Sequence, residues 1–225
     1  MSTSAKVTAR QRIENLLDDN SFVEIGAYVK ARNTDFNIQA KDTPSDGVIT
    51  GYGVINGGLV YVYSQDASVL GGSVGEMHAK KIASLYDMAM KTGSPVIGLI
   101  DSTGLRLQES VDGLNAFGQI YMKQSLASGV IPTITAIFGN CGGGLSIVAG
   151  LSDFTFMEVE NAQLFVNSPN AITENRKEIC DNASAKFQSE EAGNVDFVGT
   201  EAEVIEGIRN LVSVLPSNNE DEASD

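Results

Sequence analysis

The sequence predicts an α/β protein in which strands and helices alternate along the chain. Two β-rich runs joined by Asn56-Gly57 give residues 48–65 the pattern of a β-hairpin. Two short apolar runs, residues 95–100 and 131–138, are typical of buried parallel strands. Segments with helical periodicity separate these runs, which predicts crossover connections within one parallel sheet.

The N-terminal elements come before the hairpin. A helix is predicted over residues 8–19, where Thr8 and Gln11 have the spacing of a capping box and an apolar face follows. Residues 22–29 are predicted to be extended. Residues 30–45 are polar and aperiodic, which indicates a surface loop.

A long helix is predicted after the hairpin. It opens at Gly71-Gly72-Ser73, and Ser73 as N-cap with Glu76 three residues later has the spacing of a second capping box. Gly93 followed by Pro95 is predicted to end this helix.

The remaining elements continue the alternation. A second long helix is predicted to end at Gly129, and further strands are predicted over residues 154–159 and 163–166. Thr200 and Glu203 are predicted to cap a last helix.

Composition excludes several classes of protein. The net charge of −14 opposes binding to nucleic acid and to anionic membranes. No segment approaches the ~18 apolar residues of a membrane span, and the N-terminus has no apolar run. The two cysteines form no CxxC pair, so we expect no disulfide framework, no metal site and a cytoplasmic protein.

The length predicts one domain, residues 1–215, followed by a tail. Residues 216–225 are polar and acidic, with one alanine besides Pro216. Such a segment buries too little apolar surface to offset its ordering entropy, so we expect a disordered, solvated tail.

A glycine-rich segment, residues 139–146, follows the second buried strand. It reads Gly-Asn-Cys-Gly-Gly-Gly-Leu-Ser and precedes a presumed helix. Unpaired N–H groups at a helix N-terminus, with no side chains over the backbone, could hold an oxyanion such as a thioester enolate. The alternative is that the glycines let this helix pack closely on a neighbour, and the motif alone does not separate the two.

A second turn, Asp101 to Glu109, follows the first buried strand. It offers a backbone N–H near Gly104 and Leu105. The alternative is an ordinary strand-to-helix turn with Arg106 as a solvated charge. Successive parallel strands place their following turns at the same sheet edge, so we expect both turns to face one pocket.

Six motifs, in their order and spacing, resemble the β-subunit family of acyl-CoA carboxyltransferases. The resemblance runs from Ala9 to Asn167 and returns at Leu-Pro-Ser-Asn-Asn (215–219). The motifs are Asp-Gly-Val-Ile-Thr-Gly-Tyr-Gly (46–53), Ser-Gln-Asp (64–66), Gly-Gly-Ser-Val-Gly-Glu (71–76), Gly-Leu-Arg-Leu-Gln-Glu (104–109), Ala-Ser-Gly-Val-Ile-Pro (127–132) and Gly-Gly-Gly (142–144).

The resemblance implies a crotonase-like fold of ββα repeats and the N-terminal half of a carboxyltransferase. Such an enzyme moves CO₂ between carboxybiotin and an acyl-CoA resembling propionyl-CoA or methylmalonyl-CoA. The partners implied are a separate C-terminal half, a biotin carrier protein and further copies of the chain. The resemblance also assigns the oxyanion donors to Gly143 and Gly144. It assigns substrate contacts to Gly72, Ser73, Gly104, Leu105, Arg106 and Gly142.

The chain also departs from the family pattern. Residues 168–190 match only loosely, and Gly-Asn-Cys-Gly-Gly-Gly stands where the family often has Gly-Pro-Xaa-Ala-Gly-Gly. The cysteine-rich zinc element of the bacterial split acetyl-CoA enzymes is absent from the sequence.

Two other functions compete with this reading. A hydratase or isomerase acting alone would need a carboxylate base such as Glu76 or Glu109. We interpret Glu76 as a helix cap and Glu109 as a charge at the start of a helix. A non-catalytic half would complete an assembly without binding CoA.

Other reactive side chains have simpler interpretations. The single histidine, His78, is expected to be a surface or packed helix residue, and Cys141 a small buried thiol. Lys80, Lys81, Lys91 and Arg106 could meet CoA phosphates, but each lysine is interpreted as a solvated charge.

Overall fold

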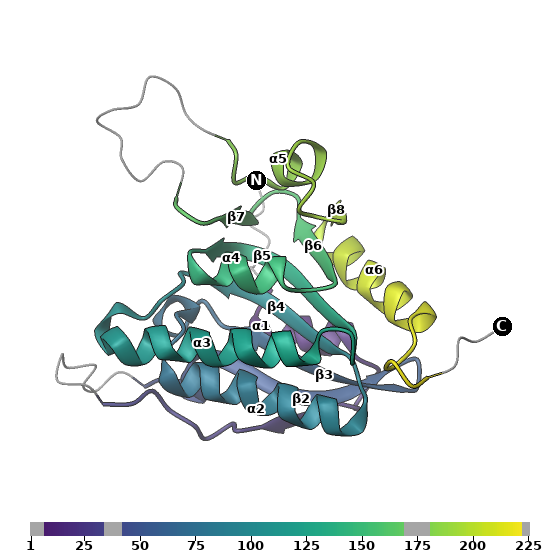
Figure 1. Ribbon diagram of the computed structural model, residues 1–225, viewed down its shortest axis with the longest axis horizontal. Coiled ribbons are helices and arrows are strands. Elements are labelled where there is room, and N and C mark those ends of the chain that lie inside the picture. Colours follow the sequence, from purple (N-terminus) through teal and green to yellow (C-terminus); the bar gives the residue numbers. More distant parts are fainter. Residues whose placement is uncertain (1–6, 34–41, 169–180, 222–225) are drawn as a thin grey trace.

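A computed structural model describes residues 7–33, 42–168 and 181–221 (Figure 1). Within these residues one eight-stranded sheet has the order β1-β2-β3-β4-β5-β6-β8, and β7 pairs with β5. The strands β1 to β3 pair antiparallel, and every pairing from β3 onward is parallel, which confirms the predicted α/β class. The strands are β1 (Val23–Ile25), β2 (Val48–Ile55), β3 (Gly58–Gln65), β4 (Val96–Ser102), β5 (Thr133–Gly142), β6 (Phe154–Glu158), β7 (Gln163–Phe165) and β8 (Phe197–Gly199).

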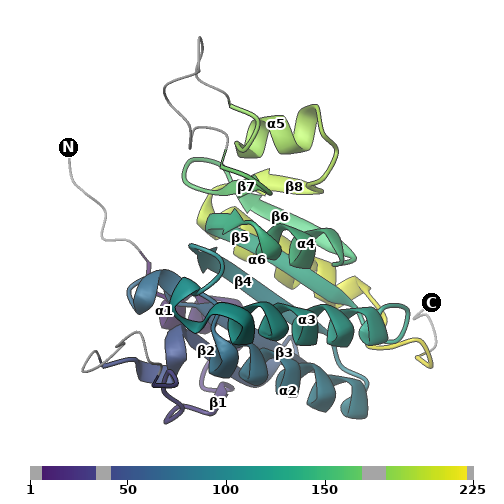
Figure 2. The same cartoon turned by 60° about the vertical axis from the view of Figure 1, so that its left-hand side comes forward.

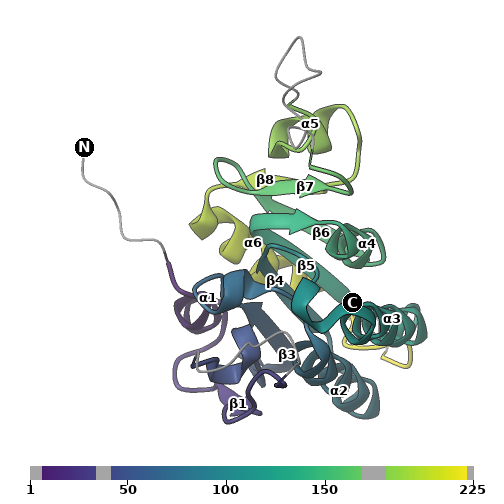
Figure 3. The same ribbon diagram turned by 90° about the vertical axis from the view of Figure 1, so that its left-hand side faces the viewer.

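Helices cover both faces of the sheet (Figures 2 and 3). One face carries α2 (Glu76–Thr92), α3 (Ser110–Ala127) and α4 (Gly144–Gly150), and the other carries α1 (Ala9–Leu16) and α6 (Glu201–Val214). The short α5 (Ala185–Glu190) lies beyond the main layers, beside β7 and β8. Single turns of 3-10 helix occupy Pro44–Gly47, Leu70–Gly72 and Leu107–Glu109.

Side chains that alternate along the central strands divide the core into two layers. In β4, Val96 and Ile100 pack under α2 and α3, whereas Ile97 and Leu99 pack under α1 and α6. This division follows from the two-residue period of a strand, which sends successive side chains to opposite faces. A sheet buried on both faces explains why the sequence shows this strand as a continuous apolar run.

The predicted hairpin is confirmed, with Ile55 paired to Gly58 across its turn. Asn56 and Gly57 both have positive φ, 50° and 84°, as a type I′ turn requires. The capping boxes at Thr8 and Thr200 are also confirmed, and Gly93 ends α2 in the left-handed conformation.

The capping box predicted at Ser73 and Glu76 is wrong. Helix α2 begins two residues later than expected, with Gly75 as its N-cap and no side-chain cap bond from that residue. The N–H of Glu76 instead donates to the Glu109 carboxylate at 2.6 Å. A carboxylate from a distant segment therefore replaces the local cap.

Three further expectations differ from the structure. Strand β5 continues through Gly142, so the glycine-rich turn begins there and not at residue 139. Helix α5 and strand β8 lie where the sequence showed no clear element. The tail expected from residue 216 is held against the domain at Asn218 and Asn219, because Asn219 N–H donates to Val130 O and Asn218 Nδ2 donates to Gly93 O, both at 3.0 Å. Residues 222–225 lie outside the described residues.

Candidate functional site

Two strand-to-helix turns meet at the carboxyl edge of the sheet. Ser102, at the end of β4, is paired with Cys141 of β5. A Cβ added to Gly104 would lie 3.3 Å from the carbonyl oxygen of Gly142, so the two backbones are in near contact. The structure therefore brings together the two turns that the sequence singled out.

A third segment, residues 71–74, lies against the first turn. Val74 N–H donates to Gly104 O at 2.8 Å, and Arg106 N–H donates back to Val74 O at 2.9 Å. Gly72 approaches β4 so closely that an added Cβ would lie 2.4 Å from Asp101 O, so only glycine fits there. Gly72 and Ser73 thus adjoin Gly104 and Arg106.

Glycine is required for different reasons at two positions of the second turn. Gly143 has φ 60° and ψ −126°, a conformation that L side chains rarely adopt, yet an added Cβ would meet no atom within 4 Å. A Cβ on Gly144 would lie 2.7 Å from Tyr121 Oη and 3.0 Å from the Phe117 ring. Gly144 therefore does allow α4 to pack closely on α3, and the packing interpretation is correct for this position.

Backbone hydrogen bonds show which N–H groups are engaged. Gly143 N–H donates to Phe165 O at 3.1 Å, and Gly104 N–H donates to Ser102 Oγ at 3.1 Å. Gly144 and Leu145 open α4, where N–H groups have no intrahelical acceptor. Among the described residues no hydrogen bond engages the N–H of Gly144 or of Leu105, so these two groups can receive a ligand oxygen.

Arg106 is not a solvated charge. Its side chain is 1% exposed, and its Nη1 lies 2.6 Å from Asp46 Oδ1 and 2.9 Å from Glu109 Oε1. Nη2 donates to Ser73 O at 2.7 Å, and Nε to Ser73 Oγ at 3.2 Å. The guanidinium is therefore committed to holding segments of this chain together, and it has no donor to spare for a CoA phosphate.

Asp46 is the member of this cluster that the sequence analysis missed. It lies in a left-handed turn (φ 50°) before β2, fully buried, and its Oδ2 accepts the His78 N–H at 2.7 Å. Burial raises the pKa of the Asp46 carboxyl, and the Arg106 charge opposes that shift. The signal in the sequence was only Asp46-Gly47, a common turn pair.

His78 is a buried structural residue in the first turn of α2. Its Nδ1 lies 2.9 Å from Asp46 O and its Nε2 lies 3.1 Å from the Gln65 amide nitrogen. Burial, with the Arg106 charge, lowers the pKa of His78 to about 3, so the imidazole is neutral at physiological pH. These contacts fit a packed helix residue, because both ring nitrogens have partners within the chain.

Lys81 is buried, which corrects its interpretation as a solvated charge. Its Nζ donates to Ser45 O at 2.9 Å and also to Val48 O. Burial lowers the pKa of Lys81 to about 8. Lys80 is exposed and paired with Glu76, and Lys91 is exposed near the other end of α2. Neither Lys81 nor Lys80 presents an unpaired charge at the turns.

Cys141 lies directly before the glycine turn and is fully buried. Burial raises the pKa of its thiol to about 12, so no thiolate forms near neutral pH. This agrees with its interpretation as a small buried thiol.

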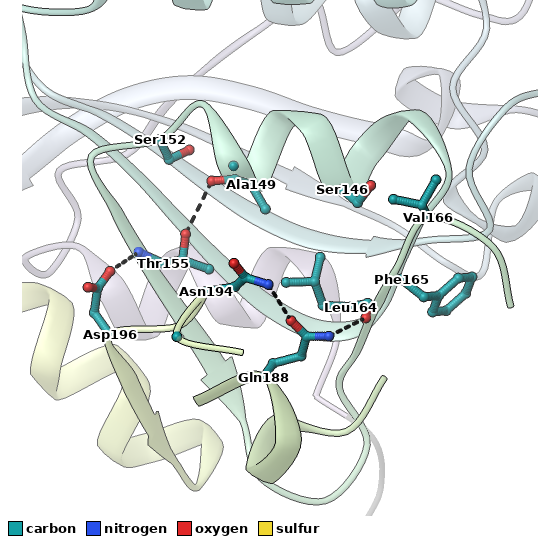
Figure 4. Close-up of a pocket in the computed structure, with 12 residues that line it drawn as sticks. Ser146, Ala149, Ser152, Thr155, Leu164, Phe165, Val166, Gln188, Asn194 and Asp196 are labelled. Carbon is teal, nitrogen blue, oxygen red and sulfur yellow. Dashed lines mark hydrogen bonds between the residues drawn. The ribbon is translucent and has the colours of Figure 1, made fainter. Parts of the chain in front are cut away.

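A pocket of about 400 Å³ lies beside α4 (Figure 4). Its floor is fixed by hydrogen bonds from Asn194 to Gln188 and from Gln188 to Leu164 O, at 2.9 and 3.3 Å. Asp196 is the one charged group among the described lining residues, and its Oδ2 accepts the Thr155 N–H. The lining therefore suits a neutral polar group better than a phosphate. It consists of Ser146, Ala149, Gly150, Ser152, Thr155, Leu164, Phe165, Val166, Gln188, Gly193, Asn194 and Asp196.

The described parts of the chain contain neither of two other classes of site. No group of three or more His, Cys, Asp or Glu side chains there could hold a metal ion. No helix there is both long enough and apolar enough to cross a membrane.

Comparisons with known proteins point to one family. The family description "Carboxyl transferase domain" matches residues 2–225. The methylmalonyl-CoA decarboxylase subunit alpha of Propionigenium modestum is 44% identical over 224 residues, which cover 98% of this chain and 43% of that protein. The propionyl-CoA carboxylase beta chain of Roseobacter denitrificans is 42% identical over 218 residues, covering 95% and 43%. The chain thus spans less than half the length of these relatives.

Solved structures agree on the fold. Transcarboxylase 12S, a hexamer solved with methylmalonyl-CoA bound, superposes with a TM-score of 0.90 at 38% identity, covering 96% of this chain and 43% of that one. One chain of a Pseudomonas malonate decarboxylase hetero-tetramer gives a TM-score of 0.79 at 25% identity, covering 92% and 80%.

Proposed function

This chain belongs to the carboxyl transferase family, and from that premise we propose that it is the acyl-CoA half of a biotin-dependent carboxyltransferase. It would work in a carboxylase or a decarboxylase that moves CO₂ between carboxybiotin and an acyl-CoA such as propionyl-CoA or methylmalonyl-CoA. The names of two relatives, methylmalonyl-CoA decarboxylase subunit alpha and propionyl-CoA carboxylase beta chain, support this substrate class. The proposal includes a cytoplasmic location, which is supported by the absence of paired cysteine motifs from the sequence.

The observation that carries the proposal is the pair of unengaged N–H groups at Leu105 and Gly144, on turns in near contact. Two such donors can stabilise the oxygen of a thioester as it becomes an enolate, and the N-terminus of α4 adds a partial positive charge. Because Gly143 donates its N–H to Phe165, the oxyanion role passes from Gly143 to Gly144 and Leu105. Gly143 then sets the orientation of the peptide that carries the Gly144 N–H.

The pocket beside α4 fits the neutral part of a cofactor or substrate. Its hydroxyl and amide groups match a ring or chain that carries both N–H and C=O groups, such as the ureido ring of biotin. Ser146 and Asn194 would hold it, and biotin on its carrier protein would supply the carboxyl group that is transferred.

A hydratase or isomerase acting alone is less well supported. Glu109 is bonded to Arg106 and to the Glu76 N–H, and the Glu76 carboxylate lies against Lys80 and Arg32. Both candidate bases are thus committed within the chain. A group from outside the chain would have to accept the substrate proton, which favours an enzyme assembled with a second half.

The proposal is tested by reconstitution. The chain is co-purified with a candidate C-terminal half and assayed with free biotin, as the carboxyl acceptor, against a panel of carboxylated acyl-CoA thioesters. We expect turnover only when both halves are present, and highest with methylmalonyl-CoA. Turnover by this chain alone would support the stand-alone enzyme. Absence of acyl-CoA binding, measured by calorimetry on the complex, would support the non-catalytic half.

A further inference from the structure

Arg12 is a buried cation on α1, the helix that covers the opposite face of the sheet from α3 and α4 (Figure 3). Its side chain is 3% exposed, and its Nη1 lies 3.2 Å from Asp101 Oδ2. Its Nε lies 2.8 Å from Glu201 Oε1. The guanidinium carbon also lies 4.7 Å from the centre of the Phe138 ring, within the range of a cation–π contact. One side chain therefore joins α1 to β4, β5 and α6.

Asp101 lies where β4 and β5 lose their regular register. The pairing is regular as far as Ile100 and shifts before Ser102, which pairs with Cys141. Gly139 of β5 lies at this shift, and an added Cβ there would lie 2.1 Å from Asp101 Oδ1. The Asp101 carboxylate thus packs against β5 at an irregularity of the kind that often reorients the end of a strand beside a functional site.

The turn that follows Asp101 carries the Leu105 N–H. Ser102 Oγ donates to Gly72 O at 2.6 Å and accepts the Gly104 N–H at 3.1 Å. These bonds begin at the residue next to Asp101, so a displacement of Asp101 would be passed along the turn to the Leu105 peptide. The contact between Arg12 and Asp101 therefore links the far face of the sheet to one of the two unengaged N–H groups.

We propose that Arg12 is a positioning residue that acts through Asp101 to fix the end of β4 and so the direction of the Leu105 N–H. Its effect on rate rests on the proposed function, because this N–H matters to turnover only if it receives the thioester oxygen. The alternative is a purely structural role, in which Arg12 only joins α1 to α6 through Glu201.

Arg209 on α6 provides a matched control, because it also joins α6 to the end of α1. Its Nη1 donates to Leu16 O at 2.6 Å, and its Nη2 lies 2.8 Å from Asp18 Oδ1. Its third partner is Asn56 in the hairpin turn, so none of its hydrogen bonds to the described residues reaches β4. A role limited to holding α1 against α6 predicts similar effects of the two arginines.

The first measurement is decarboxylation of methylmalonyl-CoA by the reconstituted complex, with free biotin as the carboxyl acceptor and each rate expressed per folded molecule. Arg12→Met should lower kcat and kcat/KM together by ~10–100-fold, because a displaced donor weakens the transition state more than the bound substrate. Arg12→Lys should recover part of the rate, because it keeps a charge near Asp101 but lacks the fork that also bonds Glu201. Arg209→Met should keep the wild-type kcat.

The second measurement is amide hydrogen exchange in the purified full chain, which needs no turnover. The amides of Thr103 and Gly104 are hydrogen-bonded at the turn, so their exchange reports its local opening. Arg12→Met should speed their exchange at least ~10-fold relative to Leu99 in the centre of β4, which reports unfolding of the core. Arg209→Met should leave this ratio unchanged.

The two measurements distinguish failure of this inference from failure of the proposed function. A wild-type complex without turnover would refute the proposed function, and hydrogen exchange would still decide whether Arg12 holds the turn. An unchanged kcat in a folded Arg12→Met complex would overturn the role in positioning. So would unchanged exchange at Thr103 and Gly104, or equal effects of Arg12→Met and Arg209→Met. If Arg12→Met does not fold, Arg12→Lys takes its place, with smaller changes expected in the same direction.

Discussion

The two turns at the carboxyl edge of the sheet lie in near contact but are built by different means. The turn after β4 is fixed by buried charge, with Arg106 bonded to Asp46 and Glu109. The turn after β5 is fixed by glycine conformation and by packing on Phe165 and Tyr121. We therefore expect a charge change at the first turn to unfold the sheet edge, whereas a change at Gly143 in the second turn should mainly move an N–H group.

Arg106→Ala should have the largest effect on stability. It leaves Asp46 and Glu109 buried without their cation, and breaking a buried pair in this way typically costs about 3–5 kcal/mol. Urea unfolding measures the change. Lys80→Ala removes an exposed pair with Glu76 and should change stability by only about 0–1 kcal/mol. An equal effect of the two variants would mean that the buried cluster does not hold the turn.

Gly143→Ala should act mainly on rate. Its Cβ has room, but φ 60° with ψ −126° is unfavourable for alanine, so the peptide carrying the Gly144 N–H should rotate. Loss of one oxyanion donor costs roughly 10²–10³ in rate. Turnover of the reconstituted complex and the melting temperature are measured together, with Gly118→Ala as control because an added Cβ there too meets no atom within 4 Å and the position is not part of the pocket lining. Full activity in a well-folded Gly143 variant would exclude the oxyanion role of the Gly144 N–H.

Gly144→Ala should act mainly on packing. The added methyl group meets Tyr121 Oη at 2.7 Å, and overpacking of this kind typically costs about 1–3 kcal/mol. Tyr121→Phe removes the clashing oxygen, so the double variant should be more stable than the sum of the two single changes predicts. Strict additivity in thermal or urea unfolding would show that the contact with Tyr121 is not what excludes a side chain.

Near neutral pH, the smallest effect should be the pH dependence contributed by His78. Its pKa is about 3 in the folded chain and ordinarily 6.5, so below pH 6.5 the unfolded chain binds the proton more readily. The free energy of unfolding should therefore fall by up to about 1.4 kcal/mol per pH unit between pH 6.5 and about 3. Unfolding of wild type and His78→Gln at pH 6.5, 5.5 and 4.5 measures the difference in slope. Parallel curves would mean that His78 is not held neutral.

The sequence predicted those features that depend on neighbouring residues. The hairpin at Asn56-Gly57, the caps at Thr8 and Thr200 and the meeting of two turns at one sheet edge each follow from local pattern. The cap of α2 could not be predicted in the same way, because its acceptor is Glu109, 33 residues away. Ser73 had the right spacing, but its hydroxyl accepts from Arg106 instead.

Long-range burial explains the other errors. Asp46 and Arg106 are 60 residues apart, and no pattern within either segment indicates that they meet. Lys81 can be buried because its Nζ donates hydrogen bonds to the carbonyl oxygens of Ser45 and Val48, which are distant in the sequence. Likewise, the docked end of the chain depends on Asn218 meeting Gly93, 125 residues earlier. Composition alone described that segment as solvated.

Chemical labelling of the Cys141 thiol can measure how often the site opens. Alkylating reagents attack the thiolate, and this thiol is fully buried, with its pKa raised to about 12. It can therefore be labelled only in molecules in which the end of β5 has opened. With Cys180 replaced by serine, the labelling rate measures local unfolding at the carboxyl edge of the sheet. Slower labelling in the presence of an acyl-CoA would show that the bound ligand stabilises this edge against opening, and it would do so without any assay of turnover.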